Sequence, residues 1–166
     1  MNIQIEYRPA TAEDFDWLLA LRKQTMDPHL TASGSDPVES SHVEAAKKDY
    51  EWARIVMLHG QNVGMVKLIR TPPEWHLRHI QISPNHQRQG LGTAVMRQLL
   101  MEAEDASATV VLNVLRVNSA MHLYERLGFM EIDCTERSIR MRWRPHQGMR
   151  DFTASCCSGR KILPGA

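Results

Sequence analysis

The run Gln87-Arg88-Gln89-Gly90-Leu91-Gly92 is the segment of the chain best suited to bind a charged ligand. It follows an apolar segment that ends at Pro84, and it leads directly into a helical pattern. Two glycines one residue apart let the backbone approach a ligand with no Cβ in the way. The first amides of a helix lack intrahelical partners and carry the positive end of the helix dipole, so they bind phosphate. The run therefore predicts a turn that binds a diphosphate.

Spacing excludes two familiar phosphate-binding turns. A P-loop needs a lysine directly after its last glycine, whereas Gly92 is followed by Thr93 and Ala94. The dinucleotide fingerprint needs a third glycine at the position that Val95 occupies here. For the run taken alone, the remaining alternative is an ordinary tight turn without a ligand.

A second motif lies between Asn118 and Phe129, after a stretch that alternates as a β-strand does. It reads Asn-Ser-Ala-Met-His-Leu-Tyr-Glu-Arg-Leu-Gly-Phe. Asn118 or Ser119 can cap a helix, an apolar stripe follows at helical spacing, and Gly128 stands where a left-handed C-terminal cap belongs. An amphipathic helix would explain the stripe and the glycine, but not the asparagine and Tyr124 at these places.

Together the two motifs resemble the signatures of the GNAT N-acetyltransferase superfamily: Gln/Arg-x-x-Gly-x-Gly/Ala, and an asparagine before a short helix that ends Tyr-Glu-Arg/Lys-Leu-Gly-Phe. The resemblance covers roughly residues 3–144. It implies an α/β fold (an α+β mixed sheet) whose central, mostly antiparallel sheet has one splayed parallel strand pair and flanking helices. It also implies an enzyme that moves an acetyl group from the cosubstrate acetyl-CoA to a primary amine, by direct attack in a ternary complex.

The resemblance also assigns the cofactor-binding residues. Asn118 matches the family asparagine that contacts the pantetheine arm, backbone amides near Ile80 would hydrogen-bond the thioester carbonyl, and Ile82 would pair with the pantetheine amides. Amides aimed at a developing oxyanion lower the barrier to acyl transfer. The pyrophosphate would bind the glycine turn, which consists of Gln87, Arg88, Gln89, Gly90, Leu91, Gly92 and Thr93.

The strand expected from Trp75 to Ser83 breaks the period-two pattern, because Ile80 and Ile82 share one face while Leu77 has the opposite parity. A β-bulge would produce this break, as would a strand buried on both faces. In the resembled family this strand carries a bulge beside the thioester. Its splay from the parallel neighbour, here the segment 110–117, opens a slot for the pantetheine arm.

Acyl transfer to an amine needs a base for the amine and an acid for the departing thiolate. Tyr124 matches the family position whose hydroxyl reaches the thioester sulfur, so it is the expected acid; a buried tyrosine with a packing role is the alternative. His76 lies six residues before Ile82, where several family members carry Glu or His, and histidine titrates near working pH. Glu74 and His79 compete for the role of base, and a water chain is a further candidate.

The acceptor is left open by the sequence. In the resembled family the first helix, the loop after it and the second helix shape the acceptor pocket, and here these segments carry Met26, His29, His42, Glu44, Asp49, Tyr50 and Trp52. Acidic side chains there would suit a cationic amine, either a small molecule or a peptide or protein amine. A homodimer is compatible with the resemblance. The alternative to an enzyme is a non-catalytic CoA- or acyl-CoA-binding or sensing module on the same fold.

Composition predicts a single cytoplasmic domain. The chain has 166 residues, 43% of them hydrophobic and 23% charged, with a formal net charge of +1, which gives no reason to expect nucleic-acid or membrane binding. No stretch approaches the roughly 20 apolar residues of a membrane span, and the N-terminus lacks the pattern of a signal peptide. Three cysteines do not form a disulfide framework, and no metal-binding spacing is present, so no metal is expected.

The predicted domain spans residues 1–146, and residues 147–166 are predicted to be a flexible tail that contains Cys156 and Cys157. Pro28, Gly34 and Pro37 predict a loop over residues 27–41. Helices are predicted near 11–26, 43–50 and 91–106, and strands near 3–7, 53–58, 63–69, 75–83, 110–117, 129–134 and 138–143.

Overall fold

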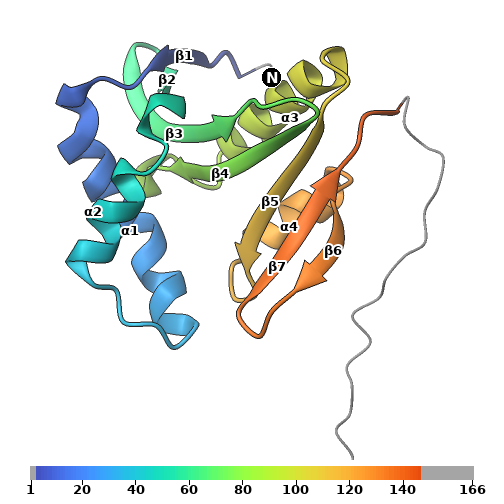
Figure 1. Ribbon diagram of the computed structural model, residues 1–166. Helices are drawn as coiled ribbons and strands as arrows, with labels where there is room; N and C mark the ends of the chain where they lie inside the picture. The colour runs from blue at the N-terminus through green and yellow to red at the C-terminus, as the bar shows by residue number, and fades with distance from the viewer. Residues whose placement is uncertain (1–2, 147–166) are drawn as a thin grey trace, which may run out of the picture.

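Seven strands form one mixed sheet in the computed structural model, which describes residues 3–146 (Figure 1). Their order in the sheet is β1-β2-β3-β4-β5-β7-β6. β4 and β5 are parallel and every other neighbouring pair is antiparallel, as predicted. The strands are β1 (Glu6–Pro9), β2 (Ala53–Leu58), β3 (Gln61–Ile69), β4 (Glu74–Ile82), β5 (Thr109–Leu115), β6 (Met130–Cys134) and β7 (Ser138–Trp143).

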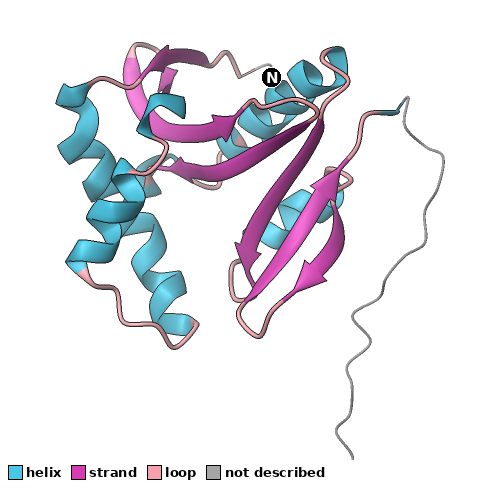
Figure 2. Cartoon of the chain, in the orientation of Figure 1, coloured by secondary structure: helices cyan, strands magenta, loops and turns pink. Residues whose placement is uncertain are grey.

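Helices cover both faces of this sheet (Figure 2). The helices are α1 (Phe15–Ala32), α2 (Glu39–Lys47), α3 (Leu91–Asp105) and α4 (Ala120–Arg126), with short 3₁₀ turns η1 (Ala12–Asp14), η2 (Tyr50–Trp52) and η3 (Pro84–His86). Successive side chains of a strand point to opposite faces of the sheet, so neighbouring residues belong to different cores. Val56 joins the larger core with α3 and α4, while Ile55 packs with Leu18 and Leu21 of α1.

The bulge predicted for β4 is present. Lys67 of β3 pairs with His79 and the next residue, Leu68, pairs with Leu77, so Arg78 is an extra residue on β4. Pairing between β4 and β5 stops at the same point, at Leu77. Beyond it the two strands diverge, which is visible as a V in Figure 1.

The predicted loop over residues 27–41 is wrong, because α1 continues through Pro28 to Ala32. Proline removes one helical hydrogen bond but does not end this helix. The ending signal is Gly34, whose φ of +78° lets the amide of Ser35 bond the Leu30 carbonyl at 2.9 Å. The second helix accordingly starts earlier than predicted, at Glu39.

The predicted strands 53–58 and 63–69 form a hairpin, but its turn has two residues where four were expected, because β3 starts at Gln61. His59 and Gly60 form the turn, both with positive φ, as a type I′ turn requires. The predicted left-handed cap is confirmed, because α4 is followed by Gly128 with a φ of +92°. The predicted domain boundary and tail, with Cys156 and Cys157, lie outside the described residues. No described helix is long and apolar enough to cross a membrane.

A bidentate ion pair fixes β1 to the start of α1. Arg8 donates to the two carboxylate oxygens of Asp14, at 2.7 Å from Nη1 and 2.8 Å from Nη2. The same carboxylate accepts the backbone N–H of Thr11 at 2.8 Å, a contact typical of a capping box at the start of a helix. The hydrogen bonds from Arg8, followed by those from Thr11, hold the pKa of the Asp14 carboxyl well below its usual range.

Replacing Asp14 with asparagine should lower the free energy of unfolding at neutral pH by about 1–2 kcal/mol, because a charge-assisted bidentate contact is lost. Since the folded-state pKa is depressed, this stabilisation is complete above the unfolded pKa of about 4 and declines as the pH falls below it. Denaturant melts at several pH values measure it. Asp16→Asn, at an exposed position in the first turn of α1, is the control, and equal effects of the two variants would contradict the prediction.

Candidate active site

The glycine turn presents free backbone amides. Gly90 has a φ of +80° and caps α3, and the first intrahelical bond runs from the Ala94 amide to the Gly90 carbonyl at 2.9 Å. The amides of residues 91–93 therefore have no partner within the helix. The Gln87 side chain fixes the turn to the end of β4 by donating to the Ile82 carbonyl at 2.8 Å.

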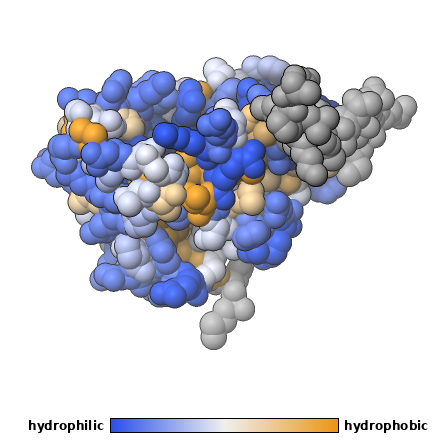
Figure 3. Space-filling model, turned by 90° about the horizontal axis from the view of Figure 1, so that it is seen from below, coloured by the Kyte–Doolittle hydropathy of each residue, from blue (hydrophilic) through white to orange (hydrophobic). Residues whose placement is uncertain are grey.

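One pocket, here called the glycine-turn pocket, is lined by Tyr124 and most of the predicted cofactor-binding residues, in a volume of about 360 Å³. Gln89 is the predicted cofactor-binding residue outside it, because its side chain donates to the Asn85 carbonyl at 3.2 Å instead. Viewed from below, hydrophobic side chains gather in the middle of this side of the molecule and hydrophilic ones surround them (Figure 3). The predicted residues that line the pocket are Ile80, Ile82, Gln87, Arg88, Gly90, Leu91, Gly92, Thr93, Asn118 and Tyr124.

Asn118 is the residue that caps α4. Its Oδ1 accepts the backbone N–H of Ala120 at 2.9 Å, whereas the Ser119 side chain makes no capping bond. This contact fixes the orientation of the amide group and leaves the Nδ2 donors for a ligand in the pocket.

Tyr124 lies on α4 with only 6% of its surface exposed, and its ring packs against Phe129 with centroids 5.7 Å apart. Burial raises the pKa of the Tyr124 hydroxyl to about 12. None of the hydrogen bonds found within residues 3–146 uses this hydroxyl. It is thus a protonated donor, at neutral pH, on the wall of the glycine-turn pocket.

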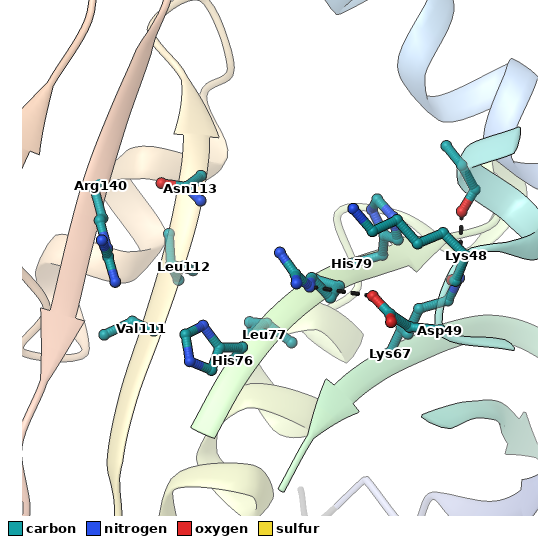
Figure 4. Close-up of a pocket in the computed structure, with 12 residues that line it drawn as sticks. Lys48, Asp49, Lys67, His76, Leu77, His79, Val111, Leu112, Asn113 and Arg140 are labelled. Atoms are coloured by element: carbon teal, nitrogen blue, oxygen red, sulfur yellow. Dashed lines mark hydrogen bonds and ion pairs between the residues drawn. The ribbon is translucent and has the colours of Figure 1, made fainter. Parts of the chain in front are cut away.

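A second pocket of about 350 Å³, here called the bulge pocket, is lined by residues of β4 around the bulge (Figure 4). β4 lines the bulge pocket from His76 to His79 and the glycine-turn pocket from Ile80 to Ile82. The other walls of the bulge pocket are Ala45, Lys48, Asp49, Lys67, Val111, Leu112, Asn113 and Arg140. The lining of β4 therefore changes from one pocket to the other two residues after the bulge at Arg78.

The three candidate bases lie in different surroundings. His76 lines the bulge pocket with its side chain 37% exposed, and its Nε2 is 3.6 Å from a carboxylate oxygen of Glu74. Glu74 lines neither of these two pockets; it faces Arg140 and Arg142, each with a guanidinium nitrogen 3.5 Å away. Burial, reinforced by the charges of three neighbouring cations, lowers the pKa of His79 to about 3. His79 is therefore neutral and a weak proton acceptor.

The residues expected around the acceptor are dispersed. Asp49 lines the bulge pocket, but Met26 and His29 line the glycine-turn pocket instead. His42 is buried, with its Nε2 2.9 Å from Asp27, and the Tyr50 hydroxyl donates to the Thr11 carbonyl at 2.7 Å. Glu44 and Trp52 line neither pocket.

Sequence reasoning missed Lys67. This side chain is 1% exposed, and its ammonium donates to the carbonyls of Ala45, Ala46 and Lys48 at 3.3, 3.2 and 2.6 Å. It thereby caps the C-terminal end of α2, where a cation is favourable, although burial lowers its pKa to about 8. The available signal was a lone charge within an otherwise apolar strand, because a buried charge requires partners.

The family model of the acetyltransferase (GNAT) domain matches residues 46–131 of the chain. This match contains both sequence motifs, and the fold is the one that the resemblance implies. The chain belongs to the GNAT acetyltransferase family. No curated protein sequence matches it.

Solved structures show the same fold at low sequence identity. The PaiA N-acetyltransferase of Thermoplasma acidophilum, in complex with coenzyme A, superposes with a TM-score of 0.68 at 14% identity, over 85% of this chain and 99% of that one. An acetyltransferase of Thermus thermophilus gives 0.69 at 17%, over 87% and 99%. The ribosomal-protein-S18-alanine N-acetyltransferase of Escherichia coli gives 0.65 at 20%, over 90% and 100%.

Gly92 provides a direct test of the glycine turn. A Cβ at this position would meet no protein atom closer than Leu123 Cδ2 at 3.9 Å, so no contact within the protein requires glycine here. Gly92→Ala should therefore leave the melting temperature unchanged or higher, since alanine is the better helix former. It should raise the Kd for acetyl-CoA about tenfold, a loss of about 1.4 kcal/mol, because the methyl group occupies the space that the ligand needs.

Thermal-shift titration with acetyl-CoA measures both quantities, and NADH serves as a ligand control. Ala94→Ser adds one atom on the same helix at a position that does not line the pocket. Undiminished acetyl-CoA binding by Gly92→Ala would show that the cofactor does not approach this turn.

Proposed function

We propose that the protein is an N-acetyltransferase that moves an acetyl group from acetyl-CoA to a primary amine. The observation that carries the proposal is that successive residues of β4, directly after the bulge at Arg78, line two different pockets. One pocket holds the glycine turn and Tyr124, and the other holds His76. A donor and an acceptor that enter from these two sides would meet at the bulge.

In this proposal the cofactor follows the edge of β4. The amides of residues 91–93 and the guanidinium of Arg88 bind its pyrophosphate. The pantetheine arm lies in the slot beyond Leu77, where β4 has no partner on its β5 side. Its amides pair with the backbone at Ile82, and Asn118 Nδ2 contacts the arm from α4.

Catalysis then requires three groups. A backbone amide near Ile80 stabilises the oxyanion that forms when the amine nitrogen attacks the thioester carbonyl. The base, His76 directly or through water, takes the proton of the amine. Tyr124 donates its proton to the sulfur as the C–S bond breaks, and the products are the acetylated amine and CoA.

Glu74 has a supporting role in this scheme. Its carboxylate lies beside the His76 imidazole and is positioned by two arginines of β7, so it stabilises the imidazolium that proton transfer creates. His79 contributes no proton transfer, because its low pKa leaves it neutral.

Replacing Tyr124 with phenylalanine should lower kcat about 10²-fold, the lower range for loss of a general acid, while the Kd for acetyl-CoA stays close to that of the wild type. Release of the CoA thiol in the presence of an amine panel measures the rate. Tyr7→Phe is the matched control. Tyr7 is half-buried and its pKa is also raised, but it lines neither pocket.

An unchanged rate in Tyr124→Phe would remove tyrosine as the acid. A wild-type protein that binds acetyl-CoA but acetylates no amine of the panel would instead support the non-catalytic CoA-binding module.

His76→Gln should lower kcat/KM about 10²-fold, because the proposed base is gone. His79→Gln is the comparison. With a pKa of about 3, His79 is a weak proton acceptor, so its replacement should change kcat/KM much less. Rates with the same amine panel measure both effects, and a larger loss in His79→Gln than in His76→Gln would reverse the assignment.

A further inference from the structure

The bulge pocket carries more positive than negative charge. The cationic side chains that line it are Lys48, Lys67, Arg78 and Arg140, whereas Asp49 is the one carboxylate among its described lining residues. Asp49 lies 3.4 Å from Arg78 Nε, and Glu74, outside the pocket, lies 3.5 Å from Arg140. Lys48 is exposed and forms no ion pair within residues 3–146. In Figure 4, Lys48 and Lys67 lie across β4 from Arg140, so positive charge surrounds the space.

Buried donors without partners lie directly beside it. A small hollow that shares Ala45, Lys67 and His79 with the bulge pocket is also lined by Arg22 and Gln81. Arg22 Nε and Nη1 and Gln81 Nε2 are buried and have no hydrogen-bond partner among the described residues. The hollow has a volume of about 10 Å³, which is the size of a single water molecule, so it does not admit the acceptor itself. Arg22 and Gln81 therefore act on the bulge pocket as polar groups in the wall behind it.

The charge around His79 supports the same conclusion. After burial, the causes that lower its pKa are the cations Arg22, Lys67 and Arg78, which therefore act on one place from α1, β3 and β4. An acceptor with a further ammonium group, besides the amine that reacts, would be repelled by these cations. A carboxylate on the acceptor would be attracted by them.

We propose that the acceptor is an amine of amino-acid size that bears a carboxylate, which the cations that line the bulge pocket attract and bind. The proposal rests on the proposed acetyl transfer and names its substrate class. The pocket volume of about 350 Å³ is at the small end for ligand sites and suits a single amino acid. It replaces the expectation that acidic side chains would select a cationic amine.

Matched acceptors test the proposal. Amino acids and their α-amides differ in the carboxylate, and spermidine represents cationic amines. At equal concentration and neutral pH, kcat/KM should be at least about tenfold higher for the acids, which corresponds to about 1.4 kcal/mol of differential binding. The amine of an amide is less basic and more often unprotonated, so intrinsic reactivity favours the amide and works against the expected result. A preference for amides or spermidine would overturn the proposal while leaving acetyl transfer intact.

Charge reversal at Lys48 tests the pocket itself. Lys48→Glu should raise KM for the preferred amino acid about tenfold and change KM for its amide much less, because the carboxylate alone interacts with this charge. Lys47→Glu is the matched control: it makes the same charge change one residue earlier, at an exposed position that lines neither pocket. Equal effects of the two variants would overturn the proposal.

A binding measurement separates this proposal from the proposed function. With CoA saturating, calorimetry compares N-acetylated amino acids with their amides, and neither ligand requires turnover. Binding of the acids that is weakened by Lys48→Glu supports the carboxylate site even if no acetyl transfer is detected. The carboxylate site would be overturned if the N-acetylated acids failed to bind and the free amino acids failed to be acetylated. Failure of the protein to bind acetyl-CoA would refute the proposed function alone.

Discussion

The extra residue at Arg78 is the constraint on which the site depends. A bulge adds twist to the strand that carries it, and here β4 leaves the parallel neighbour β5 at Leu77, directly before the extra residue. An unbroken ladder between β4 and β5 would fill the slot with hydrogen bonds. With the bulge, β4 has no strand partner on its β5 side beyond Leu77, and its residues line the bulge pocket up to His79 and the glycine-turn pocket from Ile80.

The buried ammonium of Lys67 couples this strand to the helical layer. It binds three carbonyls at the end of α2 from a position opposite His79 in the β3–β4 ladder. That arrangement fixes α2 over the bulge pocket, and it places a positive charge beside the histidine. The cation that holds α2 in place thus also helps to keep His79 neutral, in agreement with the proposal that His76 is the base.

Features that depend on local backbone chemistry could be predicted from the sequence. The glycine turn, the Asn118 cap, Gly128 and the parity break in β4 each involve residues within a few positions of one another, and the structure has all four. The course of α1 through Pro28 could not be predicted, because it depends on packing against α2 through Lys23–Glu39 and Asp27–His42. Proline is a strong local signal, and tertiary contacts overrode it.

The charge of the bulge pocket, where we propose that the acceptor binds, could be predicted from the sequence even less. Arg22, Lys48, Lys67, Arg78 and Arg140 belong to α1, the end of α2, β3, β4 and β7, and each alone is compatible with an ordinary surface or packing role. The electrostatic potential in the bulge pocket is the sum of contributions from all of these elements. It is therefore established only when the chain has folded. The proposed phosphate site, by contrast, consists of one turn. A sequence of this kind can therefore indicate the donor while concealing the acceptor, and acceptor specificity can diverge without any change in the turn proposed to bind the cofactor.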